Sequence, residues 1–480
     1  MLRFCSFTNG RPHTGFDLSG TYLFGSDGVP MRADIQWKGN VVECNKRAAG
    51  PAGLAVLWPV DGVGTILLET TRLLERKEPY VLPLELARSQ IMRMNHKSEE
   101  WGLFDAPDAA PFNAKLAHAT QLLIKALKAD TPAQAAEAGQ KALEISVKTG
   151  EDLTRLYANI LLQRRKETAG FSRRVFGCQV APTTPVNKCA KLLADAFDFA
   201  SLPIHWKQIE STERVYHFKP LDTWVEWLTK NHIPIKGSSL VCFEDHCTPD
   251  WLHIWEHDFE TIRDLVAEHV RRVINRYGSY IQVWDVLSGV HAVQRFSFNF
   301  EQLMELTRLA LNITRQLAPR ATTIIDVVAP WGEYYARNQR TIPPMLYLDM
   351  AIQSGINFDA IGLQFIFGAG ADGMYVRDMF QISSLIDRFG TFGKPVHVTA
   401  AQVPSDTAVL QHGGSTPSLD VKAGGAWHDP WNETVQSHWL REFSETALSR
   451  PFVETITWRD LTDAPTHLLP HGGLIKTDLT

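Results

Sequence analysis

The alternation of apolar and polar residues divides the chain into three zones. In the first zone, residues 1 to about 110, short apolar stretches are followed by turn signals: Ile35–Trp37 precedes Gly39-Asn40, and Leu54–Trp58 precedes Asp61-Gly62. Short strands bounded by Gly, Asn and Asp are typical of antiparallel sheets. We therefore predict a small β-sandwich over residues 1–110.

The second zone, residues 111–170, has a helical pattern. Leu116, Leu123 and Leu127 recur on one helical face. The stretch Thr131-Pro132-Ala133-Gln134 then supplies an N-cap residue, a first-turn proline and a capping-box glutamine for a second helix that extends to about Lys166. We predict a helical hairpin that braces the zones on either side of it.

The third zone, residues 171–480, alternates apolar strand-like runs with helix-like segments, such as the amphipathic stretch Phe259–Tyr277. Such alternation is typical of a parallel sheet whose strands are buried on both faces. The strand candidates are Val175–Val180, Phe197–Leu202, Leu240–Phe243, Ile281–Leu287, Thr323–Val328, Ala360–Phe365, Val396–Thr399 and Thr455–Trp458. Eight strand–helix units over about 310 residues predict an α/β fold of the (β/α)8 or TIM barrel type.

Size and charge limit the partners of the protein. The chain has 480 residues, and its 48 Lys and Arg against 53 Asp and Glu leave a formal charge of −5. Such a balanced charge provides no net electrostatic attraction to nucleic-acid phosphates or to an anionic membrane. We therefore expect neither a nucleic acid nor a membrane as partner, and the sequence leaves the oligomeric state open.

The expected compartment follows from the chain start and the cysteines. The first residues lack the apolar core of a signal peptide, and no later apolar run approaches the length of a membrane span. The six cysteines are too few in so long a chain for a disulfide framework, and they fit a reducing compartment. We therefore expect a cytoplasmic protein.

Four stretches of the third zone occur in an order and spacing that resemble the family-10 glycoside hydrolases, which are mostly endo-1,4-β-xylanases. They are Ile235–Val241 with Thr248–Trp251, Val283–Val286, Ala360–Gln364 and Lys394–Thr399. The resemblance implies a TIM barrel that hydrolyses O-glycosyl bonds of a β-linked polysaccharide or oligosaccharide, with no cofactor.

The two glutamates that carry the family's chemistry are replaced. The family ends strand four with Asn-Glu, where this chain has Ser288-Gly289, and it ends strand seven with Thr-Glu, where this chain has Thr399-Ala400. Retaining hydrolysis needs two carboxylates about 5 Å apart, one to attack the anomeric carbon and one to protonate the leaving oxygen. Two hypotheses remain: a hydrolase with relocated carboxylates, or a carbohydrate-binding pseudoenzyme that does not cleave.

For the first hypothesis, Glu244 after strand three and Glu333 after strand five are the candidate catalytic residues. They flank the emptied end of strand four, and a separation of about 6.5–9.5 Å would suit an inverting mechanism. The resemblance implies a set of sugar contacts, of which Trp206, Gln364 and Trp458 match the family, whereas His205 replaces a lysine and Arg459 replaces a glycine. The predicted substrate-binding residues are His205, Trp206, Trp331, Gln364, Trp458 and Arg459.

A metal site is an alternative for the stretch Cys242–Cys247, which contains two thiols, two carboxylates and an imidazole. Alternation along a strand would place Cys242, Glu244 and His246 on one face. Zinc sites usually take closing ligands from a second segment of recognisable spacing, and no Cys-x-x-Cys partner occurs in the sequence. We therefore predict no metal and interpret Cys242 as a core residue.

Two tryptophans of the first zone, Trp37 and Trp58, are candidates for a sugar-stacking platform. Trp58 lies within a strand among Leu and Val residues, which favours a place in the core of the predicted sandwich.

Overall fold

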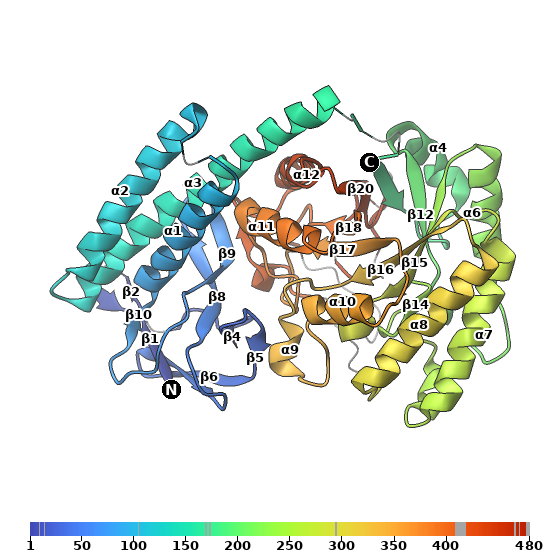
Figure 1. The fold of residues 1–480 in the computed structure, drawn as a ribbon, viewed down its shortest axis with the longest axis horizontal. Coiled ribbons are helices and arrows are strands. Elements are labelled where there is room, and N and C mark those ends of the chain that lie inside the picture. The colour runs from blue at the N-terminus through green and yellow to red at the C-terminus, as the bar shows by residue number, and fades with distance from the viewer. Residues whose placement is uncertain are drawn as a thin grey trace.

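The computed structural model describes residues 1–8, 10–13, 15–103, 105–168, 170–171, 174–292, 295–408, 419–464, 467–469 and 471–476. N-terminal β-sheets, a group of long helices and a parallel barrel follow one another along the chain (Figure 1). The predicted TIM barrel, with sheets and helices before it, is therefore confirmed.

The N-terminal region consists of two main sheets and a two-stranded ribbon. The first sheet contains, in spatial order, β10 (Tyr80–Val81), β1 (Leu2–Cys5), β7 (Val41–Lys46) and β6 (Ala33–Lys38). The second contains β19 (Ala426–Trp427), β9 (Gly64–Glu69), β8 (Gly53–Val60), β4 (Tyr22–Phe24) and β5 (Pro30–Met31), and the ribbon pairs β2 (Phe7–Thr8) with β3 (Arg11–Pro12). Because β19 comes from the barrel part of the chain, the two regions share a sheet.

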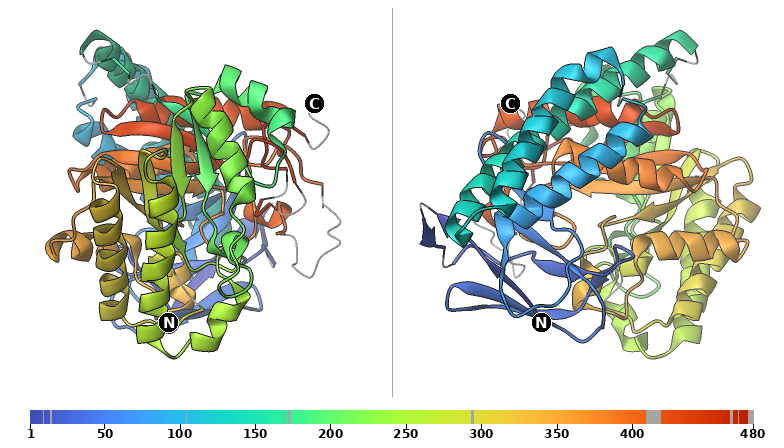
Figure 2. Two further views of the ribbon diagram at one scale, coloured as in Figure 1. Left: turned by 90° about the vertical axis from the view of Figure 1, so that its right-hand side faces the viewer. Right: turned by 60° about the vertical axis from the view of Figure 1, so that its left-hand side comes forward.

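The helical zone contains three long helices where the sequence predicted a hairpin. They are α1 (Leu82–Glu100), α2 (Ala110–Leu127) and α3 (Pro132–Thr168), and the first two both pack against α3 (Figure 2, right). The first helix begins inside the predicted sandwich, because Pro83 occupies its first turn and Leu86, Ile91 and Met94 bury one helical face. One side of α3 contacts β8, and the other contacts the barrel helices α11 and α12, so the helices do brace the two regions.

The barrel strands are all parallel and close on themselves through the pairing of β13 with β15. The strands are β11 (Phe176–Gln179), β12 (Phe199–Pro203), β13 (Ile235–Ser238), β14 (Val241–Cys242), β15 (Val283–Ser288), β16 (Thr322–Val327), β17 (Ala360–Ile366), β18 (Val396–Gln402) and β20 (Val453–Trp458). The third position is shared by β13 and β14, which are separated at Ser239, a residue in the left-handed region with φ 57°. The prediction of this strand as Leu240–Phe243 is therefore corrected: its main segment lies earlier, at Ile235–Ser238.

Helices cover the outside of the barrel. They are α4 (Val186–Ala196), α6 (Lys219–Lys230), α7 (Phe259–Tyr277), α8 (Phe300–Leu317), α10 (Pro344–Gln353), α11 (Met379–Gly390) and α12 (Glu433–Leu448), with single-turn α5 (Trp206–Ile209) and α9 (Tyr334–Arg337) near the strand ends. The bounds of α7 agree with the sequence prediction: Asp258 caps its N-terminus by accepting from the Thr261 amide, and Ile262, Val266 and Val270 are buried.

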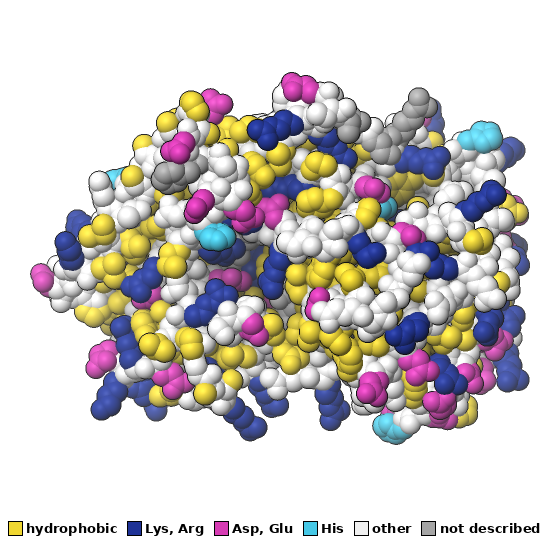
Figure 3. All heavy atoms as spheres, in the orientation of Figure 1, with side chains coloured by type: hydrophobic (Ala, Val, Ile, Leu, Met, Phe, Trp, Pro, Cys, Tyr) yellow, Lys and Arg dark blue, Asp and Glu magenta, His cyan; other side chains and the backbone are white. Residues whose placement is uncertain are grey.

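On the face that Figure 3 shows, basic and acidic side chains are interspersed, which agrees with the balanced charge. None of the described helices is long and apolar enough to cross a membrane. The barrel register brings the ends of β15 to β18 to one face, where Ser288 is paired with Asp326 and Gln364 with Ala400. A candidate site is expected there, because active sites of TIM barrels lie at the C-terminal ends of the strands.

Candidate functional site

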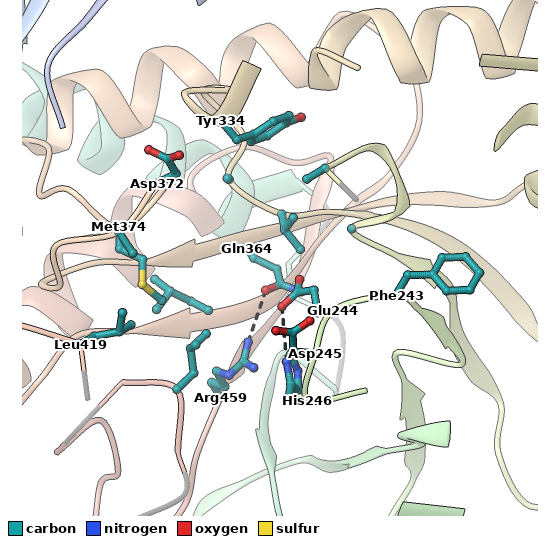
Figure 4. Close-up of a pocket in the computed structure, with 18 of the residues that line it drawn as sticks. Phe243, Glu244, Asp245, His246, Tyr334, Gln364, Asp372, Met374, Leu419 and Arg459 are labelled. Atoms are coloured by element: carbon teal, nitrogen blue, oxygen red, sulfur yellow. Dashed lines mark hydrogen bonds and ion pairs between the residues drawn. The ribbon is translucent and has the colours of Figure 1, made fainter. Parts of the chain in front are cut away.

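A cavity of about 930 Å³ opens at the C-terminal ends of the barrel strands. Its walls come from the segments that follow β14, β15, β16, β17, β18 and β20 (Figure 4). Phe243, Ile366 and Met374 are among its apolar lining residues, and Glu244, Asp245 and Asp372 are its carboxylates. Its size and mixed lining are those of a small-molecule binding site.

The polar side chains gather at one end of the cavity. In Figure 4, Glu244, Asp245, His246, Gln364 and Arg459 lie close together, away from Tyr334 and Asp372. The Glu244 carboxylate is 3.4 Å from His246 Nδ1, and Arg459 Nη1 donates to Gln364 Oε1 at 3.4 Å. Of the predicted sugar contacts, Gln364 and Arg459 are those that line the cavity.

A buried carboxylate beneath the cavity fixes the orientation of Gln364. Asp326 accepts hydrogen bonds from Ser288 Oγ at 2.6 Å, from Gln364 Nε2 at 2.6 Å and from the Thr399 hydroxyl. These donors compensate the burial of the charge. Because the amide NH2 of Gln364 is used here, its carbonyl oxygen faces Arg459. Sequence reasoning does not assign this role to Asp326, because the role depends on contacts across three strands.

Gly289 and Ala400, which stand at the positions of the family's two glutamates, have different surroundings. Gly289 has φ +66°, and a Cβ atom added there would lie 3.1 Å from Glu244 Oε1, so the Glu244 carboxylate occupies the space beside residue 289. Ala400 is buried in an apolar cluster with Ile366, Met374 and Leu469. A carboxylate therefore stands next to the first position, and apolar side chains surround the second.

The structure does not bring Glu333 to the cavity. Its side chain is fully buried and pairs with the buried Arg377, whose Nη2 is 2.7 Å from Glu333 Oε1. Arg377 also contacts Tyr22 and Glu69 of the N-terminal sheet, so this pair joins that sheet to the barrel. The prediction that Glu333 faces Glu244 across the cleft is therefore corrected: the cation that neutralises Glu333 lies in the domain junction.

Three predicted sugar-binding tryptophans are likewise not on the cavity. Trp331 lies under the Arg377 guanidinium, 4.4 Å from ring to cation. Trp206 is buried, stacks on His269 and donates to Glu210 Oε2 at 2.8 Å. Trp458 is buried and donates to the Gly472 carbonyl at 3.0 Å. The indole N–H groups of Trp206 and Trp458 are used within the protein, as is usual for buried tryptophan, and the Trp331 ring packs against Arg377 and Phe365.

His205 lies beside His246 at the polar end, with ring centroids 5.0 Å apart. The ligand atoms of His205, His246 and Cys247 are all within 4.8 Å of one another. Burial lowers the pKa of both histidines and raises that of the Cys247 thiol. The sequence analysis sought a closing Cys-x-x-Cys pair and missed this group, because its third member comes from the end of β12 and no linear spacing connects it to residues 242–247.

One family model matches more than half of the chain. The model of Glycosyl hydrolase family 10 matches residues 171–467. Endo-1,4-beta-xylanase B of Neocallimastix patriciarum is 22% identical over 205 residues, 41% of this chain and 22% of that protein. Beta-1,4-xylanase of Dictyoglomus thermophilum is 30% identical over 83 residues, 17% of this chain and 22% of that protein. The chain thus covers about a quarter or less of these relatives.

Two solved structures are similar to this chain. The structure of xylanase 10B from Thermotoga petrophila RKU-1 in complex with xylobiose has a TM-score of 0.47 and 17% identity, covering 66% of this chain and 93% of that chain. The structure of GH10 from Paenibacillus barcinonensis has a TM-score of 0.48 and 17% identity, covering 64% of this chain and 92% of that chain.

Proposed function

Because the chain belongs to glycosyl hydrolase family 10, we propose that its barrel cavity binds a β-linked oligosaccharide or polysaccharide without cleaving it by the family's retaining mechanism. The observation that carries the proposal is the surroundings of Ala400, where the resemblance places the nucleophile. Ile366, Met374 and Leu469 pack around this residue, and they offer no carboxylate to attack an anomeric carbon.

Retaining hydrolysis requires two carboxyl groups about 5 Å apart on either side of the glycosidic bond. Glu244 supplies one carboxylate beside Gly289. The buried Asp326 is held by Ser288, Thr399 and Gln364 and is not among the residues that line the cavity. With one of two required groups missing, a rate loss of about 10⁴ or more is expected, as for other catalytic groups that act as a unit.

The remaining cavity suits sugar binding. Gln364 Oε1 and the Arg459 guanidinium form a fixed polar pair that can accept from and donate to hydroxyl groups. Apolar side chains such as Met374 and Leu419 lie on the same cavity and can cover the less polar faces of a pyranose ring (Figure 4). The names of the xylanase relatives suggest linear β-1,4-xylan fragments as the first ligands to test.

Isothermal titration calorimetry with linear β-1,4-xylo- and cello-oligosaccharides tests the proposal. We expect saturable binding to the full chain, weakened about 10-fold or more by Arg459→Ala, since hydrogen bonds of a charged group contribute about 1.5–3 kcal/mol. Gln364→Ala should weaken binding as well, because it removes an acceptor and the partner of Arg459. Arg441→Ala is the matched control, because Arg441 is exposed on α12 and pairs with Glu445. The proposal would be contradicted if none of these sugars bound, or if all variants bound them equally well.

One observation favours a second candidate function, inverting hydrolysis with Glu244 as the general acid. Its Oε1 atom lies beside residue 289, where the resemblance places the family's acid. Asp372 is another carboxylate of the same cavity, and burial raises its pKa while Arg337 pairs with it. If the protein releases sugar with inversion, as read from the anomer by NMR, and Glu244→Gln abolishes the release, this second function replaces the first.

A further inference from the structure

Two histidines and a cysteine converge at the polar end of the cavity from separate segments of the chain. We propose that His205, His246 and Cys247 bind a zinc ion there. Their ligand atoms all lie within 4.8 Å of one another. In a tetrahedral zinc site, with bonds of about 2.0–2.3 Å, ligand atoms are separated by about 3.3–3.8 Å. Side-chain rotations of about 1 Å or less per ligand would therefore close the site.

The backbone holds the two contributing segments together. The Lys207 amide donates to the Cys247 carbonyl at 2.8 Å, which joins the start of α5 to the turn after β14. Within that turn, the amides of Cys247 and Thr248 both donate to the Glu244 carbonyl at 2.9 Å. The ligands thus stand on backbone that is already connected, so metal binding needs little loop ordering.

The surroundings of the three ligands also suit a metal. Glu244 Oε2 is 3.4 Å from His246 Nδ1, the carboxylate–histidine pairing that fixes the ring and leaves its other nitrogen for a metal. Arg459 is the cation that faces both histidines, and Glu244, Asp245 and Asp460 face His246 with opposite charge. Together with a thiolate at Cys247, these carboxylates outweigh the single cation.

The ligand set points to the kind of metal. Two imidazoles and one thiolate match the borderline-soft character of Zn²⁺, whereas Mg²⁺ and Ca²⁺ take oxygen ligands. Three protein ligands leave a fourth position, and His246 lines the cavity, so that position is open to water or a sugar hydroxyl. The metal would fix His246, and through it the Glu244 carboxylate, at the wall of the cavity.

Metal titration of the full chain under reducing conditions tests the site. The protein is first stripped of metal with a chelator and dialysed, and Zn²⁺ is then added. We expect the protein to bind one Zn²⁺ per chain, as measured by mass spectrometry of the metal and by competition with a chromophoric chelator. His205→Ala and Cys247→Ser are expected to weaken binding about 100-fold or more, because loss of outer-shell partners alone costs 10–100-fold. His253→Gln and Cys189→Ser are the controls, since both residues lie outside the ligand group and should leave affinity unchanged.

Cobalt substitution tests the wild-type protein directly, so the result does not depend on the folding of variants. Co²⁺ should give a thiolate charge-transfer absorption that is missing in Cys247→Ser. A wild-type protein that takes up less than about a tenth of an equivalent of Zn²⁺ would overturn the proposal, as would a Cys247→Ser variant that binds like wild type. Calorimetry with sugars is a separate measurement, so failure of sugar binding and failure of metal binding are distinguishable.

Discussion

The substitution Glu333→Gln distinguishes a structural from a catalytic role for this residue. Glu333 and Arg377 are both fully buried, and their closest atoms are 2.7 Å apart. The substitution keeps the shape of the side chain and removes its charge. We expect a loss of stability with no change in sugar binding, because Glu333 does not line the cavity.

The size of the loss follows from the contacts of Arg377. Breaking a buried ion pair by removing one partner costs about 3–5 kcal/mol. Arg377 keeps Glu69 at 3.5 Å and Gln381 at 3.1 Å, so the cost belongs at the lower end of that range. With an unfolding entropy of about 2 cal/mol/K per residue over the 480 residues, a loss of about 3 kcal/mol lowers Tm by about 3 °C.

Differential scanning calorimetry measures the shift, and titration with a xylo-oligosaccharide measures binding by the same preparations. Glu301→Gln, at an exposed glutamate of α8, is the control and should leave Tm within about 1 °C. Arg377→Met combined with Glu333→Gln should cost less than the sum of the single changes, since the pair is removed together. An unchanged Tm, or lost sugar binding at normal stability, would refute the reasoning.

Three further predictions concern the mouth of the barrel. Gly289→Ala should lower the free energy of unfolding by more than Gly393→Ala, as chemical denaturation can measure. Both residues have φ near +66°, which costs an alanine about 1–2 kcal/mol. Of the two, only residue 289 would place a Cβ atom within 4 Å of neighbouring atoms. Burial lowers the pKa of His291 to about 4, so the unfolded chain takes up a proton at this residue before the folded protein does. The free energy of unfolding should therefore fall as pH drops from 6.5 to 4. This fall should be smaller in His291→Phe, as denaturation at several pH values can show. Trp458→Phe should lower Tm yet leave oligosaccharide affinity unchanged, and reduced affinity at unchanged Tm would contradict the buried position of its indole.

The barrel could be predicted because its strands are continuous apolar runs, and the third strand shows where such reasoning fails. Leu240 to Phe243 is the more apolar run, but Ile235–Ser238 makes the main pairing with β12. A buried strand rarely contains a lysine, and the charge of Lys236 is balanced by Asp285 on β15 at 3.2 Å. Sequence hydropathy cannot report such a partner on another strand.

At the start of the helical zone, the sequence pattern is typical of a strand but the structure is a helix. Leu82, Leu84 and Leu86 alternate as in a strand, and the chain nevertheless turns helical at Leu82. The buried contacts of Leu86, Ile91 and Met94 determine the outcome, since tertiary packing overrides a local pattern of five residues.

Only part of the candidate site could be predicted from the sequence. Gln364 and Arg459 could be placed at the mouth from the sequence, because the ends of parallel barrel strands converge on one face. The fate of Glu333 could not, since its partner Arg377 lies 44 residues further along the chain. The grouping of His205 with Cys247 also depends on the closure of β12 against β13, which no spacing in the sequence reveals.

Assay of sugar release together with sugar binding tests the central claim most directly. The full chain is incubated with β-1,4-xylan and with linear xylo-oligosaccharides that bind in calorimetry, and new reducing ends are counted against a heat-denatured control. The account predicts saturable binding with no release above the control. Steady release of a product that first appears with retained anomeric configuration would show that the cavity still performs the family's chemistry, and would contradict the account.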